Sequence, residues 1–175
     1  MIFMSDFLFP EFDNNSDERH YTKESMVVDL IDILKQDFGF NENHSCVDAG
    51  SGHNKVWYKN IPCKEKYECE LDDGNDFLKF DKNVDWCIGN PPFHIGWNMT
   101  EKAMQIANIG VAFLLNNTAM RSTLEPGRIE KSINYGFYLN RQHIVRDERW
   151  SFVYHFAIYL KNKPNNFISY NVKNY

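Results

Sequence analysis

The chain has 175 residues, a formal net charge of −5, and 43% hydrophobic and 15% aromatic residues. This length suits one domain, and this apolar content supports a packed core, which excludes a wholly disordered chain. No apolar run approaches the roughly 18 residues of a membrane span, and no basic segment followed by an apolar run opens the sequence. We therefore expect a cytoplasmic protein with no membrane partner.

The N-terminal part divides into an arm and a helix. Residues 1–20 are acidic and aromatic without a clear period, and we interpret them as an arm that precedes a single domain over residues 21–175. A helix is predicted over residues 22–38, with Thr22 as its N-cap and Gly39 as its end. One face of this helix is apolar and predicted to be buried: Met26, Val27, Leu30, Ile31 and Leu34.

Behind this helix, short apolar strands alternate with helical segments, which indicates a parallel sheet with helices on both faces. The last two strands predict an antiparallel hairpin, which would add one antiparallel edge strand. The predicted fold class is therefore α/β, with a Rossmann-like, doubly wound, mostly parallel sheet that ends in a C-terminal antiparallel hairpin. The predicted strands are 45–48, 66–71, 84–88, 110–115, 142–145 and 152–160, and the predicted helices are 55–59, 98–107 and 126–134.

The four cysteines do not suggest a metal site. No CxxC pair is present, so the spacing does not fit zinc ligands. We interpret them as reduced thiols of the core and expect no metal: Cys46, Cys63, Cys69 and Cys87.

Charge is distributed unevenly along the chain. Residues 1–93 hold 9 Lys or Arg and 19 Asp or Glu, a net of −10, whereas residues 117–164 hold 8 and 4, a net of +4. The basic part could face phosphates or could be an ordinary solvated surface, and the sequence leaves both open. Its basic residues are Arg121, Arg128, Lys131, Arg141, Arg146, Arg149, Lys161 and Lys163.

Two of the three candidate functional segments follow the first two strands, where ligands bind in open α/β sheets. Asp48-Ala49-Gly50-Ser51-Gly52 places two glycines where the backbone must turn tightly and approach a ligand, although a purely structural turn has the same pattern. The third glycine of a dinucleotide site is missing, and so is the Lys-Ser/Thr of a P-loop. Glu70 ends the next predicted strand and can accept hydrogen bonds from two ribose hydroxyls, with Asp72 as a competitor.

The third segment is Asn90-Pro91-Pro92-Phe93, which follows the strand 84–88. Two prolines make the turn rigid and leave carbonyl oxygens free to accept. The Asn90 side-chain oxygen and the Pro91 carbonyl oxygen can both accept hydrogen bonds from one amino group, and Phe93 can stack on a flat ring. The segment therefore predicts a site for a planar amine, such as an unstacked base.

In this order, these segments resemble motifs I to IV of the class I amino-methyltransferases, which use S-adenosylmethionine (SAM). The similarity covers about residues 20–115, and the tail fits the remaining strands of that fold. The Asn-Pro-Pro-aromatic form is typical of enzymes that methylate N6 of adenine, with relatives that act on guanine N2 or glutamine amides. The matching segments are Asp48-x-Gly-x-Gly, Glu70, Asp76-Phe77 and Asn90-Pro91-Pro92-Phe93.

For the cofactor, the resemblance implies contacts from the strand ends and from the segment before the first helix. Asp48 would help to place the methionine end of SAM, and Glu70 would hold the ribose. Asp76 would bind the amino group of the cofactor adenine, with Phe77 beside its ring. The full implied set is Tyr21, Thr22, Asp48, Gly50, Gly52, Glu70, Asp76 and Phe77.

For the reaction, the resemblance implies that Asn90 and Pro91 bind the target amine and that Pro92 and Phe93 complete the catalytic segment. An exocyclic amine is a poor nucleophile because its lone pair is delocalised into the ring. Two acceptors on its hydrogens favour a tetrahedral nitrogen and free the lone pair for attack on a methyl donor. We expect adenine N6 in DNA as the target, in preference to RNA. RNA adenine N6 or guanine N2, protein glutamine, and a catalytically inactive binding subunit stay open.

The chain offers little room for a separate target-recognition region. Substrate selection would depend on the short loops 94–100 and 119–127, on the basic tail, or on a partner subunit. His94 lies just past the motif and could contact substrate, although a lone loop histidine is often incidental.

Overall fold

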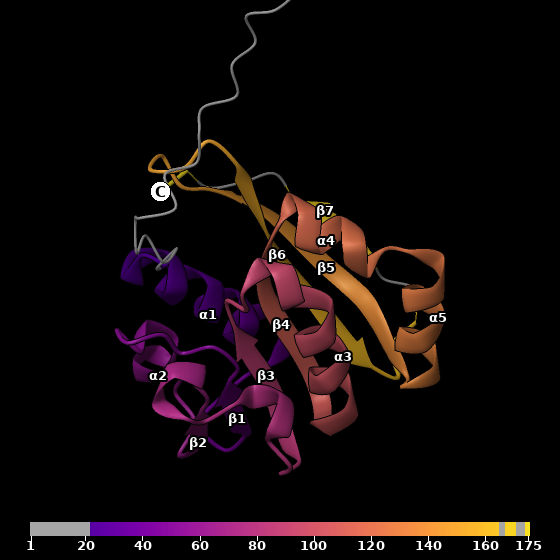
Figure 1. The fold of residues 1–175 in the computed structure, drawn as a ribbon, viewed down its shortest axis with the longest axis horizontal. Helices are drawn as coiled ribbons and strands as arrows, with labels where there is room; N and C mark the ends of the chain where they lie inside the picture. The colour runs from indigo at the N-terminus through magenta and orange to yellow at the C-terminus, as the bar shows by residue number, and fades with distance from the viewer. Residues whose placement is uncertain (1–21, 165–166, 171–173) are drawn as a thin grey trace, which may run out of the picture.

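The computed structural model describes residues 22–164, 167–170, 174 and 175, so the predicted arm and Tyr21 lie outside the described residues. One sheet forms the centre of the described chain, and its strand order is β2-β1-β3-β4-β6-β5-β7 (Figure 1). The strands are β1 (Ser45–Asp48), β2 (Glu65–Glu68), β3 (Val84–Gly89), β4 (Ala107–Asn116), β5 (Phe137–Arg146), β6 (Val153–Lys161) and β7 (Ile168–Tyr170). The helices are α1 (Glu24–Phe38), α2 (Val56–Asn60), α3 (Gly96–Ile106), α4 (Asn117–Thr123) and α5 (Pro126–Asn134). Three 3-10 turns complete the description: η1 (Leu71–Asp73), η2 (Phe77–Lys79) and η3 (Phe93–Ile95).

The predicted α/β class with a mostly parallel sheet and a C-terminal antiparallel hairpin is confirmed. β2, β1, β3 and β4 pair in parallel, and β5 and β6 form the hairpin. The predicted place of the antiparallel strand was wrong, because β6 lies between β4 and β5 rather than at an edge. Burial explains the order: most of β6 is buried on both faces, whereas β5 is mostly half-exposed and suits a place nearer the edge.

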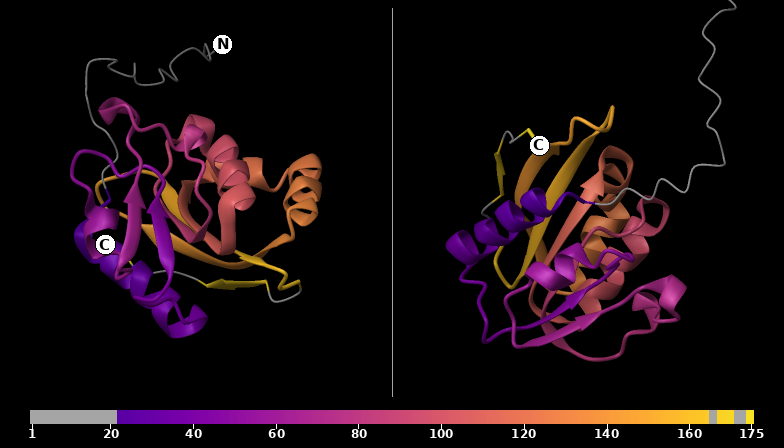
Figure 2. Two further views of the ribbon diagram at one scale, coloured as in Figure 1. Left: turned by 90° about the horizontal axis from the view of Figure 1, so that it is seen from below. Right: turned by 90° about the vertical axis from the view of Figure 1, so that its left-hand side faces the viewer.

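Helices cover both faces of the sheet, so the domain has three layers (Figure 2). The alternation within β4 shows the division of the core. Val111, Phe113 and Leu115 pack towards the side of α3 and α4, and Ala112 and Leu114 pack towards the side of α1 and α2. Because both faces are buried, the sequence of β4 is almost continuously apolar, as is usual for a central strand of a parallel sheet.

In helix α1 the predicted apolar face is found, but the predicted cap is not. All five apolar residues of that face are buried in α1. Gly39 ends the helix with φ +68°, a left-handed conformation that glycine adopts without strain. The N-cap position is Lys23, and no side chain caps it, so the cap predicted at Thr22 was wrong. Thr22 instead contacts the candidate site.

The cysteines are core residues, as predicted. All four are free and buried. Burial raises the pKa of the Cys87 thiol well above its usual range, which keeps this thiol protonated.

Candidate active site

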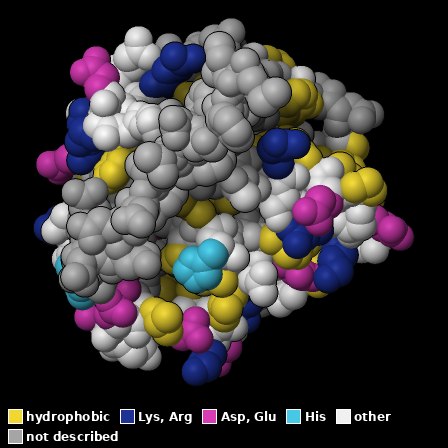
Figure 3. Space-filling model, turned by 45° about the horizontal axis from the view of Figure 1, so that its top comes forward, with side chains coloured by type: hydrophobic (Ala, Val, Ile, Leu, Met, Phe, Trp, Pro, Cys, Tyr) yellow, Lys and Arg dark blue, Asp and Glu magenta, His cyan; other side chains and the backbone are white. Residues whose placement is uncertain are grey.

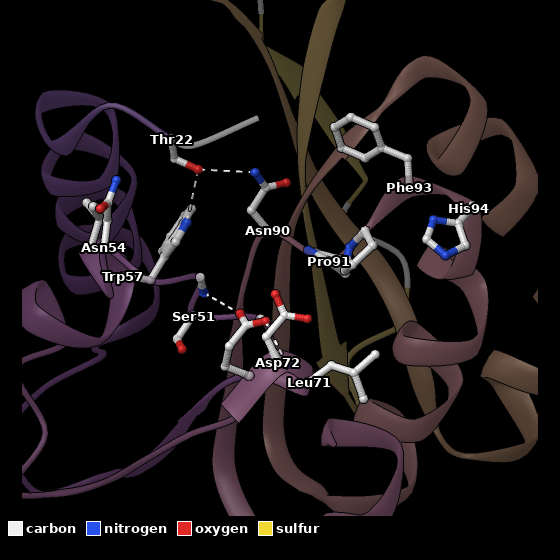
Figure 4. A pocket seen from close by; sticks show the side chains of 15 residues that line it. Thr22, Ser51, Asn54, Trp57, Leu71, Asp72, Asn90, Pro91, Phe93 and His94 are labelled. Atoms are coloured by element: carbon white, nitrogen blue, oxygen red, sulfur yellow. Dashed lines mark hydrogen bonds between the residues drawn. The ribbon is translucent and has the colours of Figure 1, made fainter. Parts of the chain in front are cut away.

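A cavity of about 570 Å³ opens at the carboxyl ends of β1, β2 and β3 (Figure 4). This is the edge of a parallel sheet at which the sequence places its three candidate segments. Figure 3 shows this face of the molecule, where hydrophobic side chains gather round a hollow beside a histidine. The described lining consists of Thr22, Gly50, Ser51, Gly52, Asn54, Val56, Trp57, Glu70, Leu71, Asp72, Asn90, Pro91, Pro92, Phe93 and His94.

Asp48 lies behind the glycine loop and does not line the cavity. Its side chain is fully buried, with Oδ2 accepting from the backbone N–H of Tyr58 at 3.0 Å and Oδ1 from that of Gly50 at 3.4 Å. Burial raises the pKa of this carboxyl to about 7, although the two N–H donors oppose the shift. Asp48 thus holds the backbone of the glycine loop and does not face the cavity.

The glycines of the loop and of the strand end β3 permit close packing of two segments. A Cβ on Gly50 would lie 3.5 Å from the Asn90 carbonyl oxygen, so this loop rests against the Asn-Pro-Pro segment. Gly52 has φ +60°, which lets its N–H face Glu70. Gly89, which the sequence analysis did not single out, has φ +148°, and a Cβ there would come within 2.9 Å of Asp48 Oδ1. The available signal was a glycine directly after a predicted strand and directly before Asn90.

Glu70 joins β2 to the glycine loop. Its Oε2 accepts from the Gly52 backbone N–H at 2.7 Å, and its Oε1 accepts from the Asp72 N–H at 3.3 Å as the cap of η1. Strand β2 therefore ends at Glu68, before the predicted end at residue 71. Leu71, missed by the sequence analysis, lies at the cavity with 67% of its surface exposed. An apolar residue directly after a strand-end acid was the signal that could have found it.

Asn90 is oriented by Thr22. Its Nδ2 donates to Thr22 Oγ1 at 3.2 Å, and Trp57 Nε1 donates to the same oxygen at 3.3 Å. The carboxamide oxygen of Asn90 consequently points away from Thr22, towards the side on which Phe93 lies (Figure 4). Asn90, Pro91, Pro92 and Phe93 all line the cavity, so the structure brings the predicted catalytic segment together with the glycine loop and Glu70.

Phe93 belongs to a group of aromatic rings at the start of β6. Its ring centroid lies 6.0 Å from that of Phe152 and 6.0 Å from that of Tyr154. Trp150 stacks on Phe152 at 6.1 Å. Edge and tilted contacts of this kind stabilise the ring positions. The turn between β5 and β6 thus supports the side chain predicted to stack on the target.

Besides Asp48, two predicted cofactor residues do not line this cavity. Asp76 caps η2, where its Oδ1 accepts from the Leu78 N–H at 2.9 Å. Phe77 is buried in the core, with its ring against those of Phe80 and Phe113. Their roles beside a cofactor adenine stay predictions, and that of Tyr21 concerns a residue outside the described ones.

The basic residues of the C-terminal part are dispersed. Four of them are engaged with acidic side chains at 4.0 Å or less: Arg128 with Glu125, Lys131 with Glu101, Arg141 with Asp37 and Arg149 with Asp147. Arg121, Arg146 and Lys163 are exposed. In Figure 3 the Lys and Arg side chains lie scattered among acidic ones. These positions favour the solvated-surface interpretation over a continuous phosphate-binding face.

Among the residues that the structure describes, no cluster of three or more His, Cys, Asp or Glu has the arrangement of a metal site. None of the helices that the structure describes has the length and apolar character needed to cross a membrane.

The sequence matches no protein-family model and no curated protein. Solved structures do resemble it. A Pyrococcus horikoshii protein classed as an RNA methyltransferase superposes with a TM-score of 0.65 at 18% identity, over 82% of this chain and 88% of the other. Magnesium protoporphyrin IX methyltransferase from Synechocystis, solved with bound SAM, gives 0.57 at 12% identity, over 79% of each chain. The chain has the class I methyltransferase fold.

The same fold occurs in larger proteins of restriction systems. A modification subunit from Vibrio vulnificus, classed with type I restriction enzymes, superposes with a TM-score of 0.63 at 13% identity. The match covers 90% of this chain but 48% of that subunit, so the chain spans about half the length of this relative. In this methyltransferase fold, the cavity described above lies at the carboxyl edge where open α/β sheets bind their ligands.

Proposed function

We propose that this chain is a SAM-dependent methyltransferase that transfers a methyl group to an exocyclic amine, with N6 of adenine in DNA as the target. One observation supports this most strongly. The Asn90 carboxamide, held by Thr22, lies in the wall of the same cavity as the glycine loop and Glu70. A residue that binds an amine and residues that suit a nucleoside cofactor thus share one space.

The cavity residues fit SAM chemically. Glu70 offers a carboxylate with lone pairs beyond those used by Gly52 and Asp72, which suits a ribose diol. Leu71 presents exposed apolar surface beside it, which suits the flat face of an adenine. The loop from Gly50 to Gly52 leaves the backbone open to a ligand. When bound, SAM would supply an activated methyl group on a sulfonium.

The protein contributes positioning and fixed dipoles. Asn90 Oδ1 and the Pro91 carbonyl oxygen would accept the two hydrogens of the target amine and localise its lone pair. Both acceptors are held before substrate arrives, Asn90 by Thr22 and the Pro91 carbonyl by the two proline rings, so little reorganisation is needed. Phe93, supported by Phe152 and Tyr154, would stack on the target base.

The choice of a nucleic acid as substrate rests on Phe93, whose ring suits stacking on an unstacked base. Because the basic residues of the C-terminal part are dispersed and four of them are engaged with acidic side chains, we propose that a partner subunit contributes to target recognition. RNA, protein glutamine and a purely binding role are alternatives that the same experiment separates.

The experiment is a transfer assay with methyl-labelled SAM. The protein is incubated with duplex DNA, single-stranded DNA, RNA or a protein extract, and each product is digested and identified. Label in N6-methyladenine of DNA supports the proposal, whereas label in RNA or methylglutamine moves the enzyme to another branch. Asn90→Ala should bind SAM but transfer nothing. The control Asn108→Ala changes an exposed residue at the start of β4, at the sheet edge away from the cavity, and should leave transfer unchanged. Binding of SAM without transfer to any substrate by the wild type would contradict the proposed methyl transfer.

A further inference from the structure

Three polar side chains from neighbouring elements form a hydrogen-bonded series. Gln142 Nε2 lies 2.6 Å from His155 Nδ1, and His155 Nε2 lies 2.5 Å from Asn117 Oδ1. The three residues come from β5, β6 and the first position of α4. None of them lines the cavity, and the proposed methyl transfer does not use them.

The direction of these hydrogen bonds follows from the atoms that form them. The Gln142 amide nitrogen donates to Nδ1, which places the imidazole proton on Nε2, where it donates to the Asn117 carboxamide oxygen. Burial lowers the pKa of His155, in keeping with this neutral form. The hydrogen-bonded series therefore ends in the Asn117 amide group. Among the described residues, no acceptor bonds to Asn117 Nδ2, and Asn117 is exposed.

Asn117, the last member of this hydrogen-bonded series, lies at the sheet edge where the proposed substrate binds. Asn117 follows β4 directly, so it lies at the carboxyl edge with Asn90, and α4 starts there beside β6 (Figure 1). Helix α4 packs against η3, which begins with Phe93. Asn117 thus lies at the same sheet edge as Asn90, on a helix that packs against η3, but outside the cavity.

An exposed side chain normally samples several rotamers, and fixing it costs conformational entropy. Here, the hydrogen bond from His155 holds Asn117 in one orientation, with its N–H donors turned outwards. Carboxamides that are held in this way suit the acceptors of a nucleic acid, which are the N7, O6 and O4 atoms of base edges and the phosphate oxygens. We infer that Asn117, positioned by His155 and Gln142, donates a hydrogen bond to the nucleotide that flanks the methylated base. This inference rests on the proposed function.

The test compares Asn117→Asp with wild type on oligonucleotides in which the bases on both sides of the target adenine are varied. Asp keeps an oxygen that accepts from His155 Nε2 but has no N–H to donate. The hydrogen bonds among the three side chains are therefore kept, and only the outward donor is lost. We expect kcat/KM to fall on the order of tenfold, the upper range for one hydrogen bond, while SAM affinity and thermal midpoint stay as in wild type. A loss confined to particular flanking bases would identify a base edge as the acceptor, and an equal loss in all contexts would identify a phosphate.

Asn108→Asp is the matched control, because it makes the same charge change at an exposed site at the other end of β4 and should leave every rate unchanged. His155→Leu should lower kcat/KM in the same flanking contexts as Asn117→Asp, since it frees Asn117 without removing its donors. Unchanged rates and profile in Asn117→Asp would overturn the inference alone. A wild-type protein that methylates no nucleic acid would overturn the proposed function and this inference together.

Discussion

The side chains of Thr22 and Asn90, 68 residues apart in the sequence, are joined by a 3.2 Å hydrogen bond from Asn90 Nδ2 to Thr22 Oγ1. Trp57 donates to the same hydroxyl oxygen at 3.3 Å. With its nitrogen held there, the Asn90 carboxamide turns its oxygen to the opposite side, where Phe93 lies. Thr22 therefore sets which atom of Asn90 faces the proposed target amine.

Removal of that hydroxyl should impair transfer more than cofactor binding. In Thr22→Val the shape is kept, but Asn90 loses the acceptor that selects its rotamer and its amide orientation. We expect kcat to fall by about 2- to 12-fold, the value of one hydrogen bond, with little change in the SAM dissociation constant. Single-turnover rates and calorimetric titration measure the two quantities. Thr22→Ser should restore the rate, and equal rates in Val and Ser variants would contradict the role.

Gly50 should tolerate alanine but not valine. A Cβ at this position would meet the Asn90 carbonyl oxygen at 3.5 Å, Pro91 Cα at 3.8 Å and Pro92 Cδ at 3.9 Å, which are ordinary contact distances. The branched side chain of Gly50→Val adds atoms where no space remains, so the loop and the Asn-Pro-Pro segment must separate. We expect SAM affinity and transfer to fall together. Normal SAM affinity in a folded Gly50→Val protein, shown by calorimetry, would refute this role of the loop.

The fold was largely predictable because its signals are local. β1 and α5 have the predicted bounds, since a short apolar run and a proline-led amphipathic segment mark them. Helix α4 was missed because it has only seven residues and begins among polar ones, where Asn116 Oδ1 accepts from the Ala119 N–H at 2.8 Å. The position of β6 inside the sheet was not predictable, since strand order is decided by competition between β5 and β6 for the buried place beside β4.

The candidate site was predictable to the extent that strand ends mark it. Asn90, Glu70 and the glycine loop line one cavity because parallel strands end at the same edge. What the sequence does not contain is the pairing of side chains across that edge. The contact of Thr22 with Asn90 depends on where α1 begins relative to β3, and burial of Phe77 depends on how η2 packs on the sheet.

Glu70 should matter for cofactor affinity through its charge. Glu70→Gln keeps an oxygen for the Gly52 N–H, now 2.7 Å from Oε2, but replaces a charge-assisted acceptor by a neutral amide. We expect SAM affinity to fall about tenfold or more, within the range for hydrogen bonds to charged groups. Asp72→Asn, at the exposed neighbouring acid, should change it by less than about twofold if surface charge alone contributes little. The reverse order in calorimetric titrations would assign the ribose to Asp72.

Asp48 should make stability depend on pH in an unusual direction. Burial raises its pKa to about 7 in the folded chain, above the value near 4 in the unfolded chain. Between these values the folded state binds the proton and the unfolded state does not, so this group's contribution to stability is complete below about pH 4 and is lost as pH rises to 7. The loss can reach about 4 kcal/mol. Urea unfolding from pH 4 to 8 should show this difference between wild type and Asp48→Asn, and parallel pH profiles would contradict it.

Gly110 should be indispensable for the packing of Trp86. A Cβ on Gly110 would come within 2.4 Å of the ring of Trp86, a fully buried residue of β3 in the core on the α1 side of the sheet. Because a filled core cannot absorb even one methyl group there without moving the ring, Gly110→Ala should lower the free energy of unfolding by about 1 to 3 kcal/mol. Gly127→Ala is the control, since a Cβ there meets nothing within 4 Å in a helix and should stabilise by about 0.5 to 1 kcal/mol. Chemical denaturation measures both, and equal stability of Gly110→Ala and wild type would show that the ring can move.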